Sequence, residues 1–280
     1  MINKMRKYFG GSSCDFKLIE FLEERAKVGD LAEAVEMLAK AMDQASKANI
    51  RLADVHNEYE KIALEKCGSL GAEYKKKAVL IDEFLYYVII KAVDVNILNK
   101  ACEKIIARKP SKITNLRGHT EIESCGSGAI INNKGEFSSI KIRMGASKIL
   151  NTGGYSSIVA QFSNKNHIIV NKSSNTRIEI KGGNSIIIDG GLGSKIIVRG
   201  TNNRIYSSST SSEFHLVGDD NVLNSTGSLS KTYICGGNNK VNCLGNDALI
   251  TQSGNESGNR IYAPNGDLKE DDWFTIFDKS

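Results

Sequence analysis

The stretch RIEIKGGNSIIIDGGLGSKIIVRGTNNRIYSS, residues 177–208, decides the fold. Within it isoleucine recurs every nine residues and glycine recurs with the same step, at Ile178, Ile187, Ile196 and Ile205 and at Gly182, Gly191 and Gly200. A fixed period of this kind indicates stacked structural repeats rather than a conventional globular sheet. Each nine-residue unit joins a polar turn rich in Gly and Asn to a short strand rich in β-branched residues, so one unit predicts one turn and one strand.

The period extends on both sides of this stretch. The isoleucine column starts at Ile122, passes through Ile158, Ile168 and Ile178 with two steps of ten, and continues into Phe214 and Leu223. The position two residues after the column alternates between small or polar residues and large ones, namely Asp189, Ser207, Ser225 and Cys243 against Val198, Leu216 and Ile234, with Gln252 as an exception. The full period is therefore eighteen, which predicts a two-walled parallel β-solenoid with two strands per coil. With about 4.8 Å per stacked strand, about eight coils would form a rod roughly 40 Å long.

One corner of the predicted coil carries a second regular column. Asn184, Asn202, Asp220, Asn238 and Glu256 follow one another at eighteen residues, with Asn203, Asn221 and Asn239 beside them. Asparagine tolerates a left-handed backbone, and its amide can bond the copies above and below. We interpret the column as a ladder that stabilises the turns rather than as a ligand site.

The chain before residue 112 has a different composition. Only five of the 26 glycines precede Pro110, and apolar residues there recur at intervals of three and four, which is typical of helices. We expect a bundle of four or five helices over Leu18–Ala26 with Asp15 as its cap, Leu31–Met42, Leu52–Lys66, Ala72–Lys91 and Val95–Ala107. Residues 84–90, FLYYVII, are apolar nearly all round, so their helix is either central to the bundle, which we favour, or covered by a partner.

These patterns together predict an α+β multidomain protein. A helical bundle would span residues 1–112, the β-solenoid residues 113–265, and a C-terminal cap residues 266–280. An open solenoid end exposes an apolar interior. We expect the cap to cover that end with Trp273, Phe274, Ile276 and Phe277.

The repeats resemble two known styles of sequence. Units such as Gly190-Gly191-Leu192-Gly193 resemble the GGxGxDxUx nonapeptides of calcium-binding RTX β-rolls over roughly residues 118–262. Calcium needs oxygen ligands. We predict no calcium binding, because the Asp of that pattern is replaced here by Lys195, Arg204, Glu213, Val222, Lys231 and Lys240. The chain is more similar to the Asn/Gly/Ser-rich β-solenoid tails of bacterial and phage-encoded intracellular proteins, a resemblance of repeat style that implies no specific function. The helical half resembles no family that we can name.

Motifs that would carry catalysis are not evident in the sequence. His56, His119, His167 and His215 fit no metal-ligand spacing, and there is no GxSxG elbow or GxxxxGK[ST] loop. The acidic pairs Asp219-Asp220 and Asp271-Asp272 are best explained as solvated acids. We therefore expect no catalytic residue, no metal and no cofactor.

Composition limits the location and the partners. The six cysteines form no CxxC pair, which favours reduced thiols in the cytoplasm. The basic N-terminus is followed by no apolar signal region, and no stretch of 18 apolar residues could span a membrane. A net charge of +5 is too small for a dedicated nucleic-acid binder, so we do not expect nucleic acid as a partner.

The outward positions of the predicted strands are the best candidates for a binding site. One wall would present Lys195, Ile197, Glu213, His215, Lys231 and Tyr233, and the opposite wall Ile188, Arg204, Tyr206 and Lys240. Rigid rings suit protein recognition because they contribute contact area at little cost in entropy. A solvated wall with chance aromatics explains the same pattern equally well.

A basic cluster lies at the predicted junction of the two domains. It comprises Lys104, Arg108, Lys109, Lys112 and Arg117, and it could contact phosphate or an acidic partner. We favour the alternative, a solvated helix end whose cations complement the helix dipole.

The leading functional hypothesis is a non-enzymatic intracellular module for protein–protein interaction. By analogy it could be a phage-encoded inhibitor of a host defence or regulatory complex. The alternative is a structural oligomer, such as a fibre or particle component that assembles through its helical half. An enzyme that uses the junction between helices and solenoid is the weakest of the three hypotheses.

Overall fold

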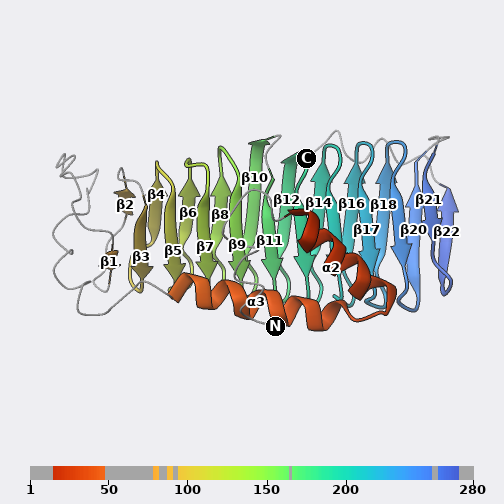
Figure 1. Ribbon diagram of the computed structural model, residues 1–280, viewed down its shortest axis with the longest axis horizontal. Helices are drawn as coiled ribbons and strands as arrows, with labels where there is room; N and C mark the ends of the chain where they lie inside the picture. Colours follow the sequence, from red (N-terminus) through yellow and green to blue (C-terminus); the bar gives the residue numbers. More distant parts are fainter. Residues whose placement is uncertain are drawn as a thin grey trace.

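The computed structural model describes residues 15–47, 78–81, 87–90, 94–163, 166–253 and 258–270. It forms a long parallel β-solenoid with two helices lying along one side (Figure 1). The strands alternate between two eleven-stranded sheets, and successive strands of the chain belong to opposite sheets. The two-walled solenoid predicted from the period is therefore confirmed.

The two walls are called sheet A and sheet B below. Sheet A contains β2 (Tyr87–Ile90), β4 (Lys104–Ala107), β6 (Glu121–Ser124), β8 (Ser139–Ile142), β10 (Ser157–Ser163), β12 (Arg177–Gly182), β14 (Lys195–Arg199), β16 (Glu213–Val217), β18 (Lys231–Cys235), β20 (Ala248–Gln252) and β22 (Gly266–Glu270). Sheet B contains β1 (Ala78–Ile81), β3 (Val95–Asn99), β5 (Ser111–Asn115), β7 (Ala129–Asn133), β9 (Ser147–Asn151), β11 (Ile168–Asn171), β13 (Ile186–Asp189), β15 (Arg204–Ser207), β17 (Val222–Ser225), β19 (Lys240–Cys243) and β21 (Arg260–Tyr262).

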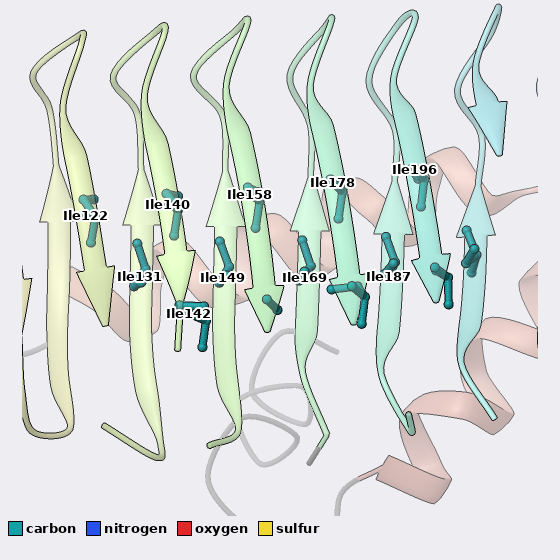
Figure 2. Packing of buried hydrophobic residues seen from close by; sticks show 14 of the residues in the cluster. Ile122, Ile131, Ile140, Ile142, Ile149, Ile158, Ile169, Ile178, Ile187 and Ile196 are labelled. Atoms are coloured by element: carbon teal, nitrogen blue, oxygen red, sulfur yellow. The ribbon is translucent and has the colours of Figure 1, made fainter. Parts of the chain in front are cut away.

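The isoleucine column forms the core between the sheets. Ile196 pairs with Ile178 and Phe214 on neighbouring coils of sheet A, and all three side chains are fully buried. Figure 2 shows the side chains of both walls pointing toward one another along the rod. One position differs from the prediction, because Ile169 rather than Ile168 pairs with Ile149 and Ile187 and continues the column. Ile168 instead points outward from sheet B into a second buried cluster.

The solenoid begins well before residue 113. Residues predicted as two helices form β1 to β4 instead, so the bundle prediction is wrong for the described residues between Ala78 and Ala107. Two features of the sequence explain why these strands were not predicted. The coil shortens there, since Ile97 pairs with Ile113 sixteen residues later and Ile105 with Ile122 seventeen residues later, and no glycine marks the turns. The predicted helix over 52–66 lies outside the described residues.

The C-terminal end also differs from the expectation. Gly266–Glu270 is not part of a cap but forms β22, which pairs in parallel with β20 and continues sheet A. The aromatic residues proposed for the cap, from Trp273 on, lie outside the described residues.

The first two predicted helices are confirmed as α2 (Asp15–Lys27) and α3 (Leu31–Lys47). Gly29, with a positive φ of 75°, lies in the turn between them. Helix α3 runs along the rod across sheet B, and its main strand contacts are with β5, β7, β9, β11 and β15 (Figure 1). The helices thus form a hairpin packed on one wall rather than a separate bundle.

Two ladders of asparagine hold the stacked turns together. At the predicted corner, Asn184, Asn202 and Asn238 adopt positive φ, and the side-chain oxygen of Asn221 accepts a bond from the backbone nitrogen of Asn203 at 3.0 Å. This turn-stabilising ladder is confirmed. Close stacking explains the glycine column beside it, because a Cβ on Gly200 would lie 2.1 Å from the carbonyl oxygen of Gly182.

The second ladder lies inside the solenoid and was not predicted. Each amide donates to the oxygen of the next coil at 2.7 to 2.9 Å, through Asn99, Asn115, Asn133, Asn151, Asn171 and finally Asp189. Asn115, Asn133 and Asn151 recur at eighteen residues, so the same period search could have found it.

Candidate interaction surface

The middle of the outer face of sheet B, from β5 to β15, is covered by the chain's own helices. Ile188 and Tyr206, expected on an open wall, are fully buried against a helix stripe that includes Leu22, Val35 and Leu38. The hydroxyl of Tyr206 donates a hydrogen bond of 2.8 Å to Glu23. From β9 to β15, the wall predicted to be open is therefore the apolar part of an intramolecular interface.

Ion pairs surround this interface. Lys134 lies 2.8 Å from Asp43, Lys172 lies 2.5 Å from Glu36, and Arg204 lies 3.8 Å from Glu23. An apolar centre with a charged border is the usual anatomy of a protein interface. Sheet B thus shows that a wall of this solenoid can bind a helical hairpin through an apolar centre bordered by ion pairs.

The outer face of sheet A carries the six predicted partner-binding residues on three adjacent strands. Lys195, Glu213 and Lys231 are aligned in one file, and Ile197, His215 and Tyr233 in the next. The rings of His215 and Tyr233 stack with centroids 4.7 Å apart. The structure therefore brings all six together, as the period predicted.

Their burial is uneven. Ile197 is 3% exposed and His215 is 6% exposed, whereas Lys195, Glu213 and Tyr233 are half-buried and Lys231 is exposed. Apolar contact through Ile197 and His215 is consequently limited. The accessible part of the surface is its charged part.

Glu213 organises the centre of this group. Lys195 donates to its Oε1 at 2.7 Å, and the same oxygen bonds Nε2 of His215. Burial would raise the pKa of Glu213, but the bonds from Lys195 and His215 bring it below its usual value. Burial lowers the pKa of His215, and the neighbouring Glu213 only partly opposes this effect. His215 is thus a packed, neutral ring at pH 7 rather than a cationic contact.

A second carboxylate, missed in the sequence, gathers three cations. Oxygens of Glu179 lie 3.0 Å from Arg177, 3.4 Å from Lys181 and 3.9 Å from Arg199. Burial would raise the pKa of Glu179, but hydrogen bonds and charges from Arg177 and Lys181 hold it below the ordinary value. Because Arg177 pairs with Lys195 and Glu179 with Ile197, extending the predicted files by one coil would have found this group.

A third group lies nearer the N-terminal end of sheet A. Glu121 bonds Lys141 at 2.9 Å and Lys104 at 3.1 Å, and Glu123 bonds Arg143 at 2.9 Å. The pKa of Glu121 is lowered, chiefly by the hydrogen bond from Lys141. Each of these carboxylates is held by cations of a neighbouring coil.

The structure does not bring the predicted basic cluster together on one face. Lys104 lies on sheet A with Arg108 just after it, and Lys112 lies on sheet B. Lys109 is in the exposed turn between these strands, whereas Arg117 follows β5 and pairs with Glu103 at 3.0 Å. No helix ends at these residues, so a helix dipole does not explain the cluster.

The outer face of sheet A has an excess of positive charge. Between β4 and β18 the described residues of this face include nine cations, namely Lys104, Arg108, Lys141, Arg143, Arg177, Lys181, Lys195, Arg199 and Lys231, against four carboxylates, Glu121, Glu123, Glu179 and Glu213. All four carboxylates bond cations of the same face. The surface can therefore attract and orient an anionic partner.

Cys125 directly follows β6, a strand of this surface. Burial raises the pKa of the Cys125 thiol, which lies beside Glu123, so this thiol is not activated. Within the described residues, no group of three His, Cys, Asp or Glu side chains is placed to hold a metal ion.

Comparisons with protein families, curated proteins and solved structures find no significant match to this chain. Among the helices that the structure describes, none has the length and apolar character needed to cross a membrane.

Proposed function

We propose that this protein is a non-enzymatic protein-interaction module whose outer sheet A face contacts a protein partner. The observation that carries the proposal is the difference between the outer faces of the two sheets. The middle of the outer face of sheet B, from β5 to β15, is covered by the chain's own helices, whereas the outer face of sheet A displays ordered charges around the His215–Tyr233 stack. A rigid wall presents such groups without a large loss of conformational entropy on binding.

The intramolecular interface supports this assignment. Sheet B holds an amphipathic helical hairpin through an apolar centre and ion pairs at its edges. Sheet A is built from parallel strands in the same way, and ion pairs line its outer face. A protein surface is thus a type of ligand that this architecture already accommodates.

Affinity capture with a matched variant tests the proposal. Tyr233→Ser removes the stacked ring from the sheet A face and should weaken capture of a specific partner from bacterial lysate about tenfold or more, the loss typical of an interface aromatic. Tyr262→Ser is the control, because Tyr262 is 58% exposed and lies on sheet B. Equal capture by both variants, or a defined oligomer without any partner, would contradict the proposal and favour a structural role.

Several finer predictions rest on the style of the repeats. Phage or bacterial origin, inhibition of a host complex and cytoplasmic location follow from resemblance and composition, and they stay predictions.

A further inference from the structure

We infer that the partner presents an acidic protein surface, and that one of its carboxylates binds where Arg177, Lys181 and Arg199 converge. This inference rests on the proposed function and specifies the partner of the same face. It starts from the Glu179 group, in which three cations share one carboxylate.

The geometry of this group favours an incoming carboxylate. The Glu179 side chain is only 12% exposed, whereas the side chains of Arg177, Lys181 and Arg199 are 51%, 48% and 33% exposed. One negative charge therefore lies beneath three positive charges that reach solvent. Arginine guanidinium groups bind carboxylates through paired N–H donors. Since Glu179 already restrains the cations, less conformational entropy is lost when a second carboxylate binds.

The rest of the outer face of sheet A also favours an anionic partner. Lys195 and Lys231 follow on β14 and β18, and a second cationic group lies on β4 to β8 around Glu121 and Glu123. Between the two groups, β10 presents only neutral outward residues, Ser157, Val159 and Gln161. The step from β6 to β14 covers four strand spacings, about 19 Å. An anionic surface of that extent belongs to a macromolecule rather than to a small ion.

The interleaved carboxylates favour a protein over a nucleic acid. Four glutamates lie among the nine cations, and a continuous phosphate backbone laid along the face would pass close to all four. An acidic protein surface can place its few cations or neutral groups opposite these positions. Complementary charge also speeds association and selects the partner.

The test uses the full chain and defined probes at low ionic strength. An oligoglutamate peptide should bind the wild type, and added salt should weaken this binding. Arg177→Gln combined with Arg199→Gln should weaken the binding of the peptide about tenfold. The control is Lys240→Gln combined with Arg260→Gln, which removes the same charge from exposed positions of sheet B and should change the affinity less than about twofold. If the arginine variant does not fold, Lys181→Gln with Lys231→Gln replaces it.

Three results would overturn the inference. These are no binding of the peptide, an equal loss in both variant pairs, or tighter binding of a single-stranded or duplex DNA through the same arginines. The salt dependence of partner capture separates this inference from the proposed function. Capture that requires Tyr233 but is insensitive to salt refutes the acidic partner alone, whereas capture that no sheet A substitution affects refutes the proposed function itself.

Discussion

Asp189 is the one carboxylate in the interior amide ladder, and its replacement by asparagine should stabilise the protein at neutral pH. Its Oδ1 accepts bonds from Asn171 at 2.7 Å and Ser194 at 3.0 Å, and its Oδ2 accepts one from Ser207 at 3.3 Å. The side chain is fully buried. Burial raises the pKa of Asp189, and the hydrogen bonds oppose this effect only in part.

The magnitude follows from what asparagine would keep and what it would remove. In Asp189→Asn the retained oxygen can still accept from Asn171 and Ser194, and the new amide can donate to the Ser207 hydroxyl. The substitution therefore replaces a carboxyl group whose charged form is penalised by burial with a neutral amide, and it keeps the oxygen that accepts from Asn171 and Ser194. We expect a gain of about 1 to 2 kcal/mol in the free energy of unfolding at pH 7. This corresponds to an increase of roughly 2 to 8 °C in Tm.

The pH dependence provides the sharper measurement. Because folding raises the pKa of Asp189, the folded state keeps its proton to a higher pH than the unfolded state. The wild type therefore loses stability from this group as the pH rises from the ordinary carboxyl pKa to the raised one. Urea denaturation of both proteins at pH 4 and pH 7 should show that the advantage of Asp189→Asn shrinks at the lower pH. A variant that is less stable than the wild type at pH 7 would show that the ladder needs the carboxylate.

Three further predictions concern the core, the helices and calcium. Ile196→Asp places a charge at a fully buried core position and should lower the free energy of unfolding by about 4 kcal/mol or more. Lys195 is a half-exposed neighbour on the outer face, so Lys195→Gln should lower it by about 1 kcal/mol or less. Equal losses in chemical denaturation would show that the two faces are misassigned. Leu38→Ala removes a fully buried contact between α3 and sheet B and should cost about 2 to 5 kcal/mol, and a much smaller loss would indicate that the helices add little to the fold. Addition of EGTA should leave Tm unchanged, because the turn positions of the calcium pattern are mostly basic or apolar here, and a fall of many degrees would refute that interpretation.

Sequence periodicity predicted the solenoid because each inward column obeys one constraint. A side chain between the walls must be apolar and must match its neighbours on the coils above and below, so Ile178, Ile196 and Phe214 follow one another at a fixed step. Where the coil length changes, the constraint persists but the step does not. Val88, Ile105 and Ile122 form the same column at seventeen residues, and the segments of Val88 and Ile105 were interpreted as helices for that reason.

Other features could not be predicted because they depend on contacts between distant segments. Nothing in the alternation of β13 and β15 reveals that Ile188 and Tyr206 face helices more than 140 residues earlier in the chain. A continuous apolar run such as Ile186–Ile188 was the available signal, since a strand buried on both faces loses its alternation of apolar and polar residues. The same run was assigned to an open wall because the helices had been placed in a separate domain.

The outer faces, unlike the core, are free to differ from coil to coil, and their differences explain the arrangement of the molecule. Sheet B carries a cluster of buried apolar outward residues from β9 to β15, at Leu150, Ile168, Val170, Ile186, Ile188 and Tyr206, and the apolar stripe of the helices packs on this cluster. Sheet A has charged residues at the equivalent positions, so the hairpin would have to desolvate Glu179, Arg177 and Lys195 to pack there. Burying charges in this way costs several kcal/mol per ion unless new partners replace the water. The charges on sheet A therefore explain why the chain's own helices pack on sheet B, and they leave the opposite face to the anionic partner that we propose.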